Sequence, residues 1–161
     1  MEFNTNCLHV FLDLEQTLID SWDNPMRLNT SQLLMGRLVD LKQKHPDCQF
    51  HIFSFAIWDV VDIFTFNEFK SNIEEFFNIK ITHVIPRDKV LIAVKKIRNV
   101  QILDADEMSQ LFGKTDSWID FCKSQMIHSA ILFDDKTDEM EMKLRFKGEF
   151  FNLSTVEVSF S

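Results

Sequence analysis

Residues 8–18, LHVFLDLEQTL, join a short apolar run to a cluster of polar side chains. The apolar part, residues 8–12, is bounded by polar residues, which is typical of a strand buried on both faces of a parallel sheet. Similar runs recur along the chain at residues 50–57 (FHIFSFAI), 81–85 (ITHVI), 100–103 (VQIL) and 130–133 (AILF). Together these runs predict the strands of a mainly parallel sheet.

Amphipathic stretches between these runs predict helices, because their apolar residues recur at helical spacing. The stripes are Leu34, Leu38 and Leu41, after an N-cap at Thr30 or Ser31; Ile57, Val60, Val61 and Phe64; Ile73, Phe76 and Phe77; Leu91, Val94 and Ile97; and Trp118, Cys122 and Met126, after a cap at Thr115. Strand–helix alternation of this kind predicts a doubly wound α/β domain. At the end of the chain, Val156, Val158 and Phe160 alternate and predict an edge strand.

The composition is that of a globular protein. Of the 161 residues, 45% are hydrophobic and 26% are charged, which predicts one domain over residues 1–161. The 17 basic and 25 acidic residues give a net charge of −8, which argues against binding to nucleic acid or to anionic membranes. With only three glycines, the sequence has none of the glycine-rich loops that bind nucleotides.

Cysteine usage and hydropathy bear on location. Cys7, Cys48 and Cys122 are widely spaced and form no CxxC pair, which predicts free thiols in a reducing compartment. The sequence has neither a signal-peptide pattern nor an apolar stretch of membrane-spanning length, so we expect a cytoplasmic protein without a membrane partner. His9 and His51 lie inside apolar runs and are expected to be core residues.

Polar side chains follow the apolar runs at the points where ligands bind in parallel sheets, beyond the carboxyl ends of the strands. Singly, each has a structural explanation as a turn residue, a helix cap or a solvated lysine. Jointly they predict a site, since adjacent carboxylates from two strands repel each other unless a cation lies between them, and Mg²⁺ prefers oxygen ligands. The candidates are Asp13, Glu15, Ser54, Lys114, Asp134 and Asp135.

This set resembles the motifs of the haloacid dehalogenase-like (HAD-like) superfamily, whose members are mainly Mg²⁺-dependent phosphohydrolases with a Rossmann-like sheet. VFLDLEQTL is similar to the family's strand followed by DxDx[TV], and FHIFS to its strand ending in Ser or Thr. GKTDSWIDF and AILFDDKTDE are similar to its lysine motif and to its strand ending in acids. Lys114 precedes Asp134 by 20 residues, a spacing common in the family.

The resemblance implies a phosphatase that acts through an aspartyl-phosphate. Asp13 would be the nucleophile, and Glu15 stands where the family's phosphatases usually carry the Asp that serves as acid and base. Glu15 keeps the carboxyl group but adds one methylene. The further implied roles are phosphoryl binding by Ser54 and Lys114, loop geometry from Thr17, and Mg²⁺ binding by Asp13, the Glu15 carbonyl, Asp134 and Asp135.

Segment lengths leave no room for a large cap domain over the site. Only 37 residues separate Thr17 from Ser54, and 60 separate Ser54 from Lys114. We therefore expect an open site for a phosphorylated small molecule or macromolecule. One alternative is a catalytically impaired HAD-like module that binds a protein partner, because Glu15 departs from the family pattern. Another is that the acidic residues are solvated turns of a different α/β fold.

Overall fold

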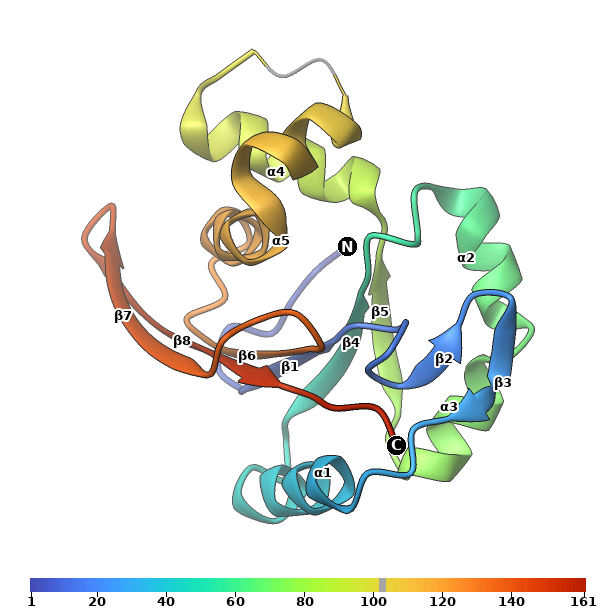
Figure 1. Cartoon of the computed structure of the whole chain (residues 1–161). Coiled ribbons are helices and arrows are strands. Elements are labelled where there is room, and N and C mark those ends of the chain that lie inside the picture. Colours follow the sequence, from blue (N-terminus) through green and yellow to red (C-terminus); the bar gives the residue numbers. More distant parts are fainter. Residues whose placement is uncertain (102–103) are drawn as a thin grey trace.

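Strands and helices alternate along the chain in the computed structural model, which describes residues 1–101 and 104–161 (Figure 1). The strands are β1 (His9–Leu12), β2 (Ile19–Ser21), β3 (Asn24–Leu28), β4 (Gln49–Phe53), β5 (Ile81–Ile85), β6 (Ser129–Asp134), β7 (Met140–Phe146) and β8 (Glu149–Glu157). The helices are α1 (Gln32–Lys44), α2 (Val60–Asn67), α3 (Lys70–Phe77), α4 (Arg87–Arg98) and α5 (Ala105–Ser124). The predicted α/β class is confirmed.

The central sheet has six strands in the order β5-β4-β1-β6-β8-β7. All neighbours in it are parallel except β7 and β8, which are antiparallel. Strands β2 and β3 form a separate hairpin between β1 and α1. The mainly parallel sheet flanked by helices is compatible with the predicted Rossmann-like arrangement (Figure 1).

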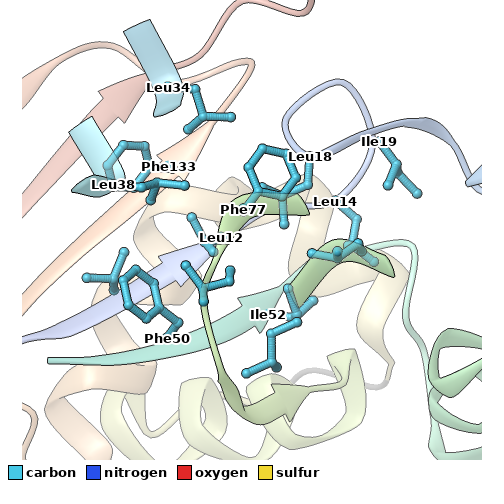
Figure 2. Packing of buried hydrophobic residues seen from close by; sticks show 14 of the residues in the cluster. Leu12, Leu14, Leu18, Ile19, Leu34, Leu38, Phe50, Ile52, Phe77 and Phe133 are labelled. Atoms are coloured by element: carbon cyan, nitrogen blue, oxygen red, sulfur yellow. The ribbon is translucent and has the colours of Figure 1, made fainter. Parts of the chain in front are cut away.

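Alternating side chains of β1 bury two apolar clusters, one on each face of the sheet. Leu12 packs in a cluster that includes Leu34 of α1 and Phe77 of α3 (Figure 2). Phe11 points to the opposite face, where α4 and α5 contribute apolar residues such as Trp118. A strand buried on both faces explains why residues 8–12 read as a continuous apolar run.

Four of the predicted runs are confirmed as strands, since residues 8–12, 50–57, 81–85 and 130–133 overlap β1, β4, β5 and β6. The second run is only half strand, because β4 ends at Phe53 and Ser54 follows it directly. Helix α1 begins after Ser31, whose hydroxyl accepts a hydrogen bond from the Leu34 N–H and so acts as the predicted cap. All three cysteines are free, as predicted.

The C-terminal strand is not at the edge of the sheet, so that prediction is wrong. Strand β8 lies between β6 and β7, and β7 forms the edge. The sequence held a signal for β7, because Met142, Leu144 and Phe146 alternate with charged residues before Lys147 and Gly148. Lys147 and Gly148 both have positive φ angles, 49° and 79°. A two-residue turn with positive φ at both positions favours a β-hairpin.

The predicted strand at residues 100–103 finds no support in the described part of the chain. Val100 and Gln101 belong to no strand, and residues 102–103 lie outside the described residues. Helix α4 ends at Arg98 and is terminated by its cap residue Asn99, whose backbone is left-handed (φ 52°). Among the described strands, β5 therefore remains at the edge of the sheet.

Helix α2 does not bury its predicted apolar stripe. Asp59 caps the helix, so Ile57 lies before it, and the helix buries Phe66 instead. The remaining residues of the stripe are exposed to solvent: Val60 by 60%, Val61 by 64% and Phe64 by 69%.

Helix α5 consists of two helical segments that meet at Gly113, which has non-helical φ and ψ angles of 73° and 178°. The first segment, after the N-cap Asp104, was not predicted. Thr115 is not a cap; its hydroxyl lies 3.2 Å from that of Thr137. None of the described helices, α5 included, is long and apolar enough to cross a membrane.

Three histidines from adjacent strands, the buried His9 and His51 and the half-buried His83, form a chain of hydrogen bonds. His9 Nε2 lies 2.5 Å from the Asn4 carbonyl oxygen and therefore donates to it. His9 Nδ1 is then the acceptor for His51 Nε2 at 2.8 Å, and His51 Nδ1 is the acceptor for His83 Nδ1 at 3.3 Å. One carbonyl thus fixes three neutral tautomers. A proton added to His51 Nδ1 would face the N–H of His83 Nδ1, so this hydrogen bond would be lost and the two donors would repel each other.

We expect the histidine chain to make the protein less stable in acid. Burial, with the neighbouring His9 and His83, lowers the pKa of His51 from 6.5 to about 2. The unfolded chain therefore binds more protons than the folded chain below pH 6.5, and stability falls as the pH drops. For His51 the loss is about 2–3 kcal/mol at pH 4.5. Urea unfolding at several pH values measures this slope.

The slope must be compared between variants, because other groups titrate in the same range. His51→Leu should flatten the dependence between pH 6.5 and 4.5, whereas His45→Gln, at an exposed position, should not. Equal slopes in the wild type and His51→Leu would show that His51 does not carry the effect.

Candidate active site

The carboxyl ends of β4, β1 and β6 bring the predicted site residues together at one edge of the sheet. Asp13 follows β1, Ser54 follows β4, and Asp134 ends β6. Lys114 of α5 reaches them from the helical segment that follows Gly113. These four residues line one cavity of about 790 Å³.

Lys114 bridges two carboxylates from neighbouring strands. Its Nζ atom lies 2.6 Å from Asp13 Oδ1 and 3.0 Å from Asp134 Oδ2. Burial opposes the charged form of Asp134, yet Lys114 and the backbone N–H of Lys136 hold its pKa below the ordinary value. The side chains of Lys114, Asp13 and Asp134 are all largely buried, so the attraction between the lysine and the two carboxylates is stronger than that of a surface ion pair.

Asp135 completes a trio of carboxyl groups with Asp13 and Asp134. One oxygen from each lies within 4.8 Å of the others. Burial, followed by the hydrogen bond and charge of Asp134 and the charge of Asp13, raises the pKa of Asp135 to about 7. A divalent cation among these oxygens would favour the charged form of Asp135, against both the burial and the neighbouring carboxyl groups that raise this pKa. The trio could therefore hold a hard metal ion.

The tight loop after β1 fixes the orientation of Asp13. The Leu14 carbonyl oxygen accepts hydrogen bonds from the N–H groups of Thr17, Leu18 and Ile19. The buried Thr17 hydroxyl then donates to Asp13 Oδ2 at 3.2 Å. Together, Thr17 and Lys114 contact both carboxylate oxygens of Asp13, which leaves its side chain little rotational freedom. Thr17 thus lies where its predicted role in loop geometry requires.

Glu15 and Ser54 line the cavity without contacting the carboxyl trio directly. Glu15 Oε2 accepts a hydrogen bond from the Trp22 N–H at 2.8 Å, which ties the loop to the β2–β3 hairpin. Ser54 is buried, and its Oγ accepts from the Ala56 N–H at 3.2 Å. The Ser54 hydroxyl hydrogen therefore remains free to donate to a ligand.

Sequence reasoning missed several residues of the cavity wall, among them Phe55, Trp58 and Arg87. Arg87 begins α4 directly after Pro86, just past β5. The rule that located Asp13 and Asp134 would also have found Arg87, because ITHVI was recognised as a strand. Phe55 and Trp58 had no such signal, since apolar residues in a loop are more often packing residues.

The fold and the cavity define an α/β protein in which three carboxyl groups at one end of a mainly parallel sheet meet a half-buried lysine of α5. No protein-family model, no curated protein and no solved structure matches this chain. The HAD-like superfamily is therefore, for this chain, a resemblance of short sequence motifs.

Proposed function

We propose that this protein is a HAD-like, Mg²⁺-dependent phosphohydrolase that acts through an aspartyl-phosphate intermediate. The observation that carries the proposal is the bridge from Lys114 to Asp13 and Asp134, beside Asp135, at the carboxyl edge of the sheet. Phosphoryl transfer needs a nucleophile, a metal ion and positive groups around the phosphoryl oxygens. These residues provide the nucleophile, the ligands and one such positive group.

Asp13, Asp134 and Asp135 fit Mg²⁺, because all three offer carboxylate oxygens that lie within 4.8 Å of one another. Burial, and after it the neighbouring carboxyl groups, raises the pKa of Asp135, and a bound cation would favour its charged form. The Glu15 carbonyl, on the same loop as Asp13, is the fourth proposed ligand. When bound, Mg²⁺ would neutralise charge on the phosphoryl oxygens.

In the proposed reaction, an Asp13 oxygen bonds to phosphorus and the bond from phosphorus to the leaving oxygen breaks. Lys114 and Thr17 hold the Asp13 carboxylate in position. Lys114 also offsets negative charge on the phosphoryl group, and the Ser54 hydroxyl donates to one of its oxygens. Glu15 protonates the leaving oxygen and then takes a proton from the water that hydrolyses the aspartyl-phosphate.

The segments around the cavity favour an open site. From Thr17 to Ser54 the chain forms the β2–β3 hairpin, α1 and β4, and α2 and α3 follow before β5. A volume of about 790 Å³ accommodates a small phosphate ester or one phosphorylated side chain of a macromolecule. The substrate is therefore proposed to be a phosphorylated small molecule or macromolecule.

A binding module that has lost turnover is the second candidate, and one observation favours it. The Glu15 carboxylate already accepts a hydrogen bond from the Trp22 N–H, so in this conformation it supports the hairpin. A group held in this way must release that contact, or use its second oxygen, to act as acid and base.

Mg²⁺ should both stabilise the protein and be required for hydrolysis of an aryl phosphate such as 4-nitrophenyl phosphate. An ion that binds only the folded state at ten times its dissociation constant adds about 1.4 kcal/mol to the free energy of unfolding. For a chain of this size, Tm should then rise by about 3–6 °C. Thermal unfolding and turnover are measured with Mg²⁺ and with EDTA.

Asp134→Asn should remove the thermal shift, whereas Asp40→Asn, at an exposed residue of α1 paired with Lys44, should retain it. A shift without turnover would favour the binding module. Neither a shift nor turnover in the wild type would favour solvated turns on an α/β fold of another kind.

A further inference from the structure

Arg87 lies in the cavity wall, and the backbone fixes it to the loop that follows β4. The Arg87 N–H donates to the Ile57 carbonyl oxygen at 2.9 Å, and the Asp88 N–H donates to that of Trp58 at 3.2 Å. This loop begins at Ser54, the residue proposed to bind the phosphoryl group. The start of α4 and the phosphoryl-binding loop therefore form one connected wall.

The Arg87 side chain is held as firmly as its backbone. Its Nε donates to the Phe55 carbonyl oxygen at 2.7 Å. The guanidinium carbon lies 3.9 Å from the centre of the Trp58 ring and 4.8 Å from that of Phe55. Only 14% of the side chain is exposed. A guanidinium fixed in this way loses little further freedom when it binds a ligand.

The positive charge of Arg87 is poorly matched by the protein. Within the described residues its one ion-pair partner is Asp106, which is 70% exposed and 3.5 Å away. Burial lowers the pKa of Arg87, against the smaller effect of Asp106. Lys114, by contrast, already contacts two carboxylates. Within the described residues, no acceptor forms a hydrogen bond with the Nη2 group of Arg87, so its N–H donors are free for an anion.

We propose that Arg87 binds a second negatively charged group of the substrate, a carboxylate or a further phosphate on the leaving group. This inference rests on the proposed function, in which Lys114 and the metal site take the reacting phosphoryl group. Arg87 and Lys114 lie 4.8 Å and 5.9 Å from the centre of the Phe55 ring, so both cations border this one side chain. Both residues also line the same cavity, so a ligand in that cavity faces both cations.

A leaving group with a second negative charge would need a cation beside it in this cavity, whose lining holds Lys136 and Lys114 besides Arg87 but is richer in acidic residues. The lining includes five acidic residues, which repel an anionic leaving group: Asp13, Glu15, Asp20, Asp134 and Asp135. Arg87 is an ordered cation in that wall, and its planar fork of donors matches a carboxylate or a phosphate. The substrate class is thus a phosphate monoester with a second anionic group.

Matched aryl phosphates test this preference. The probes are 3-carboxyphenyl phosphate, 1,3-phenylene bisphosphate and 3-carbamoylphenyl phosphate, whose second substituent is neutral, all assayed at saturating Mg²⁺. Wild-type kcat/KM should favour at least one charged probe over the neutral one by about 10- to 100-fold. The favoured probe identifies the second group as carboxylate or phosphate. Arg87→Met, which keeps an apolar stem over the rings, should abolish the preference.

Arg145→Met is the control, because its guanidinium also lies over an aromatic ring, 5.2 Å from the centre of Phe150, but on β7 outside the cavity lining. It should leave the preference unchanged. Arg87→Lys should restore part of it, which separates charge recognition from loss of packing. A Tm measurement confirms that each variant is folded.

Calorimetric binding to Asp13→Asn, with and without Arg87→Met, separates this inference from the proposed function. Turnover of all probes without preference would overturn the role of Arg87 and leave the phosphatase intact. Absent turnover, with charged probes bound more tightly only when Arg87 is present, would overturn the phosphatase and support the anion subsite. Absent turnover and absent preference in binding would overturn both.

Discussion

Asp13→Asn should lower phosphatase turnover by about 10⁴-fold or more while the protein stays folded. An amide cannot form the acyl-phosphate bond that the proposed mechanism requires. The shape of the side chain is nevertheless retained. Asparagine offers a carbonyl oxygen to Lys114 and an amide that can donate to the Thr17 hydroxyl, in place of the two contacts that Asp13 makes. Turnover of an aryl phosphate and urea unfolding of both proteins measure the two effects.

The free energy of unfolding should stay unchanged or rise slightly in Asp13→Asn. The substitution weakens the ion pair with Lys114 to a hydrogen bond, but removing one negative charge relieves repulsion with Asp134 and Asp135, and Lys114 keeps its 3.0 Å contact with Asp134. Asp40→Asn is the matched control, since it removes an exposed carboxylate and should change neither quantity appreciably. Turnover near the wild-type rate in Asp13→Asn would exclude Asp13 as the nucleophile.

The sequence alone predicted the strands that build the site, because they are buried on both faces. Continuous apolar runs at β1, β4 and β6 are distinctive, and the polar residues that follow them, Asp13, Ser54 and Asp134, stand out by contrast. In a parallel sheet the carboxyl ends of the strands lie at the same end of the sheet, so the topology alone predicts that these three residues lie close together. To place Lys114 between Asp13 and Asp134, one must also know that the helix is interrupted at Gly113.

Features set by pairing between distant segments could not be predicted in this way. Strand β8 alternates like an edge strand, and only its position between β6 and β7 reveals that it is internal. The exposed stripe on α2 has helical spacing, but periodicity does not say which face the rest of the fold covers. The hydrogen bond from Trp22 to Glu15 depends on the β2–β3 hairpin, which carries no strong apolar signal.

That hydrogen bond makes Glu15→Gln a clean test of acid–base chemistry. In the wild type, the Trp22 N–H donates to Glu15 Oε2 at 2.8 Å. Glutamine keeps a side-chain carbonyl oxygen that can accept this hydrogen bond, so the hairpin should stay in place. The ionisable group is lost, and turnover should fall by about 10²–10⁴-fold. Glu75→Gln, at an exposed position on α3, is the control and should retain the wild-type rate.

Glu15→Asp decides whether the extra methylene of Glu15 serves catalysis or the hairpin. If Glu15 is a working acid and base, the shorter carboxylate should keep turnover within a modest factor, since a general acid and base remains on the loop. If the length of Glu15 serves only to reach Trp22, the wild type should be nearly inert, and Glu15→Asp should raise its rate by freeing the carboxyl group from the hairpin. Turnover of the wild type, Glu15→Gln and Glu15→Asp on one phosphate ester at saturating Mg²⁺ separates these outcomes. An active wild type matched by Glu15→Gln would refute the acid–base role, whereas a gain in Glu15→Asp over an inert wild type would favour the binding module.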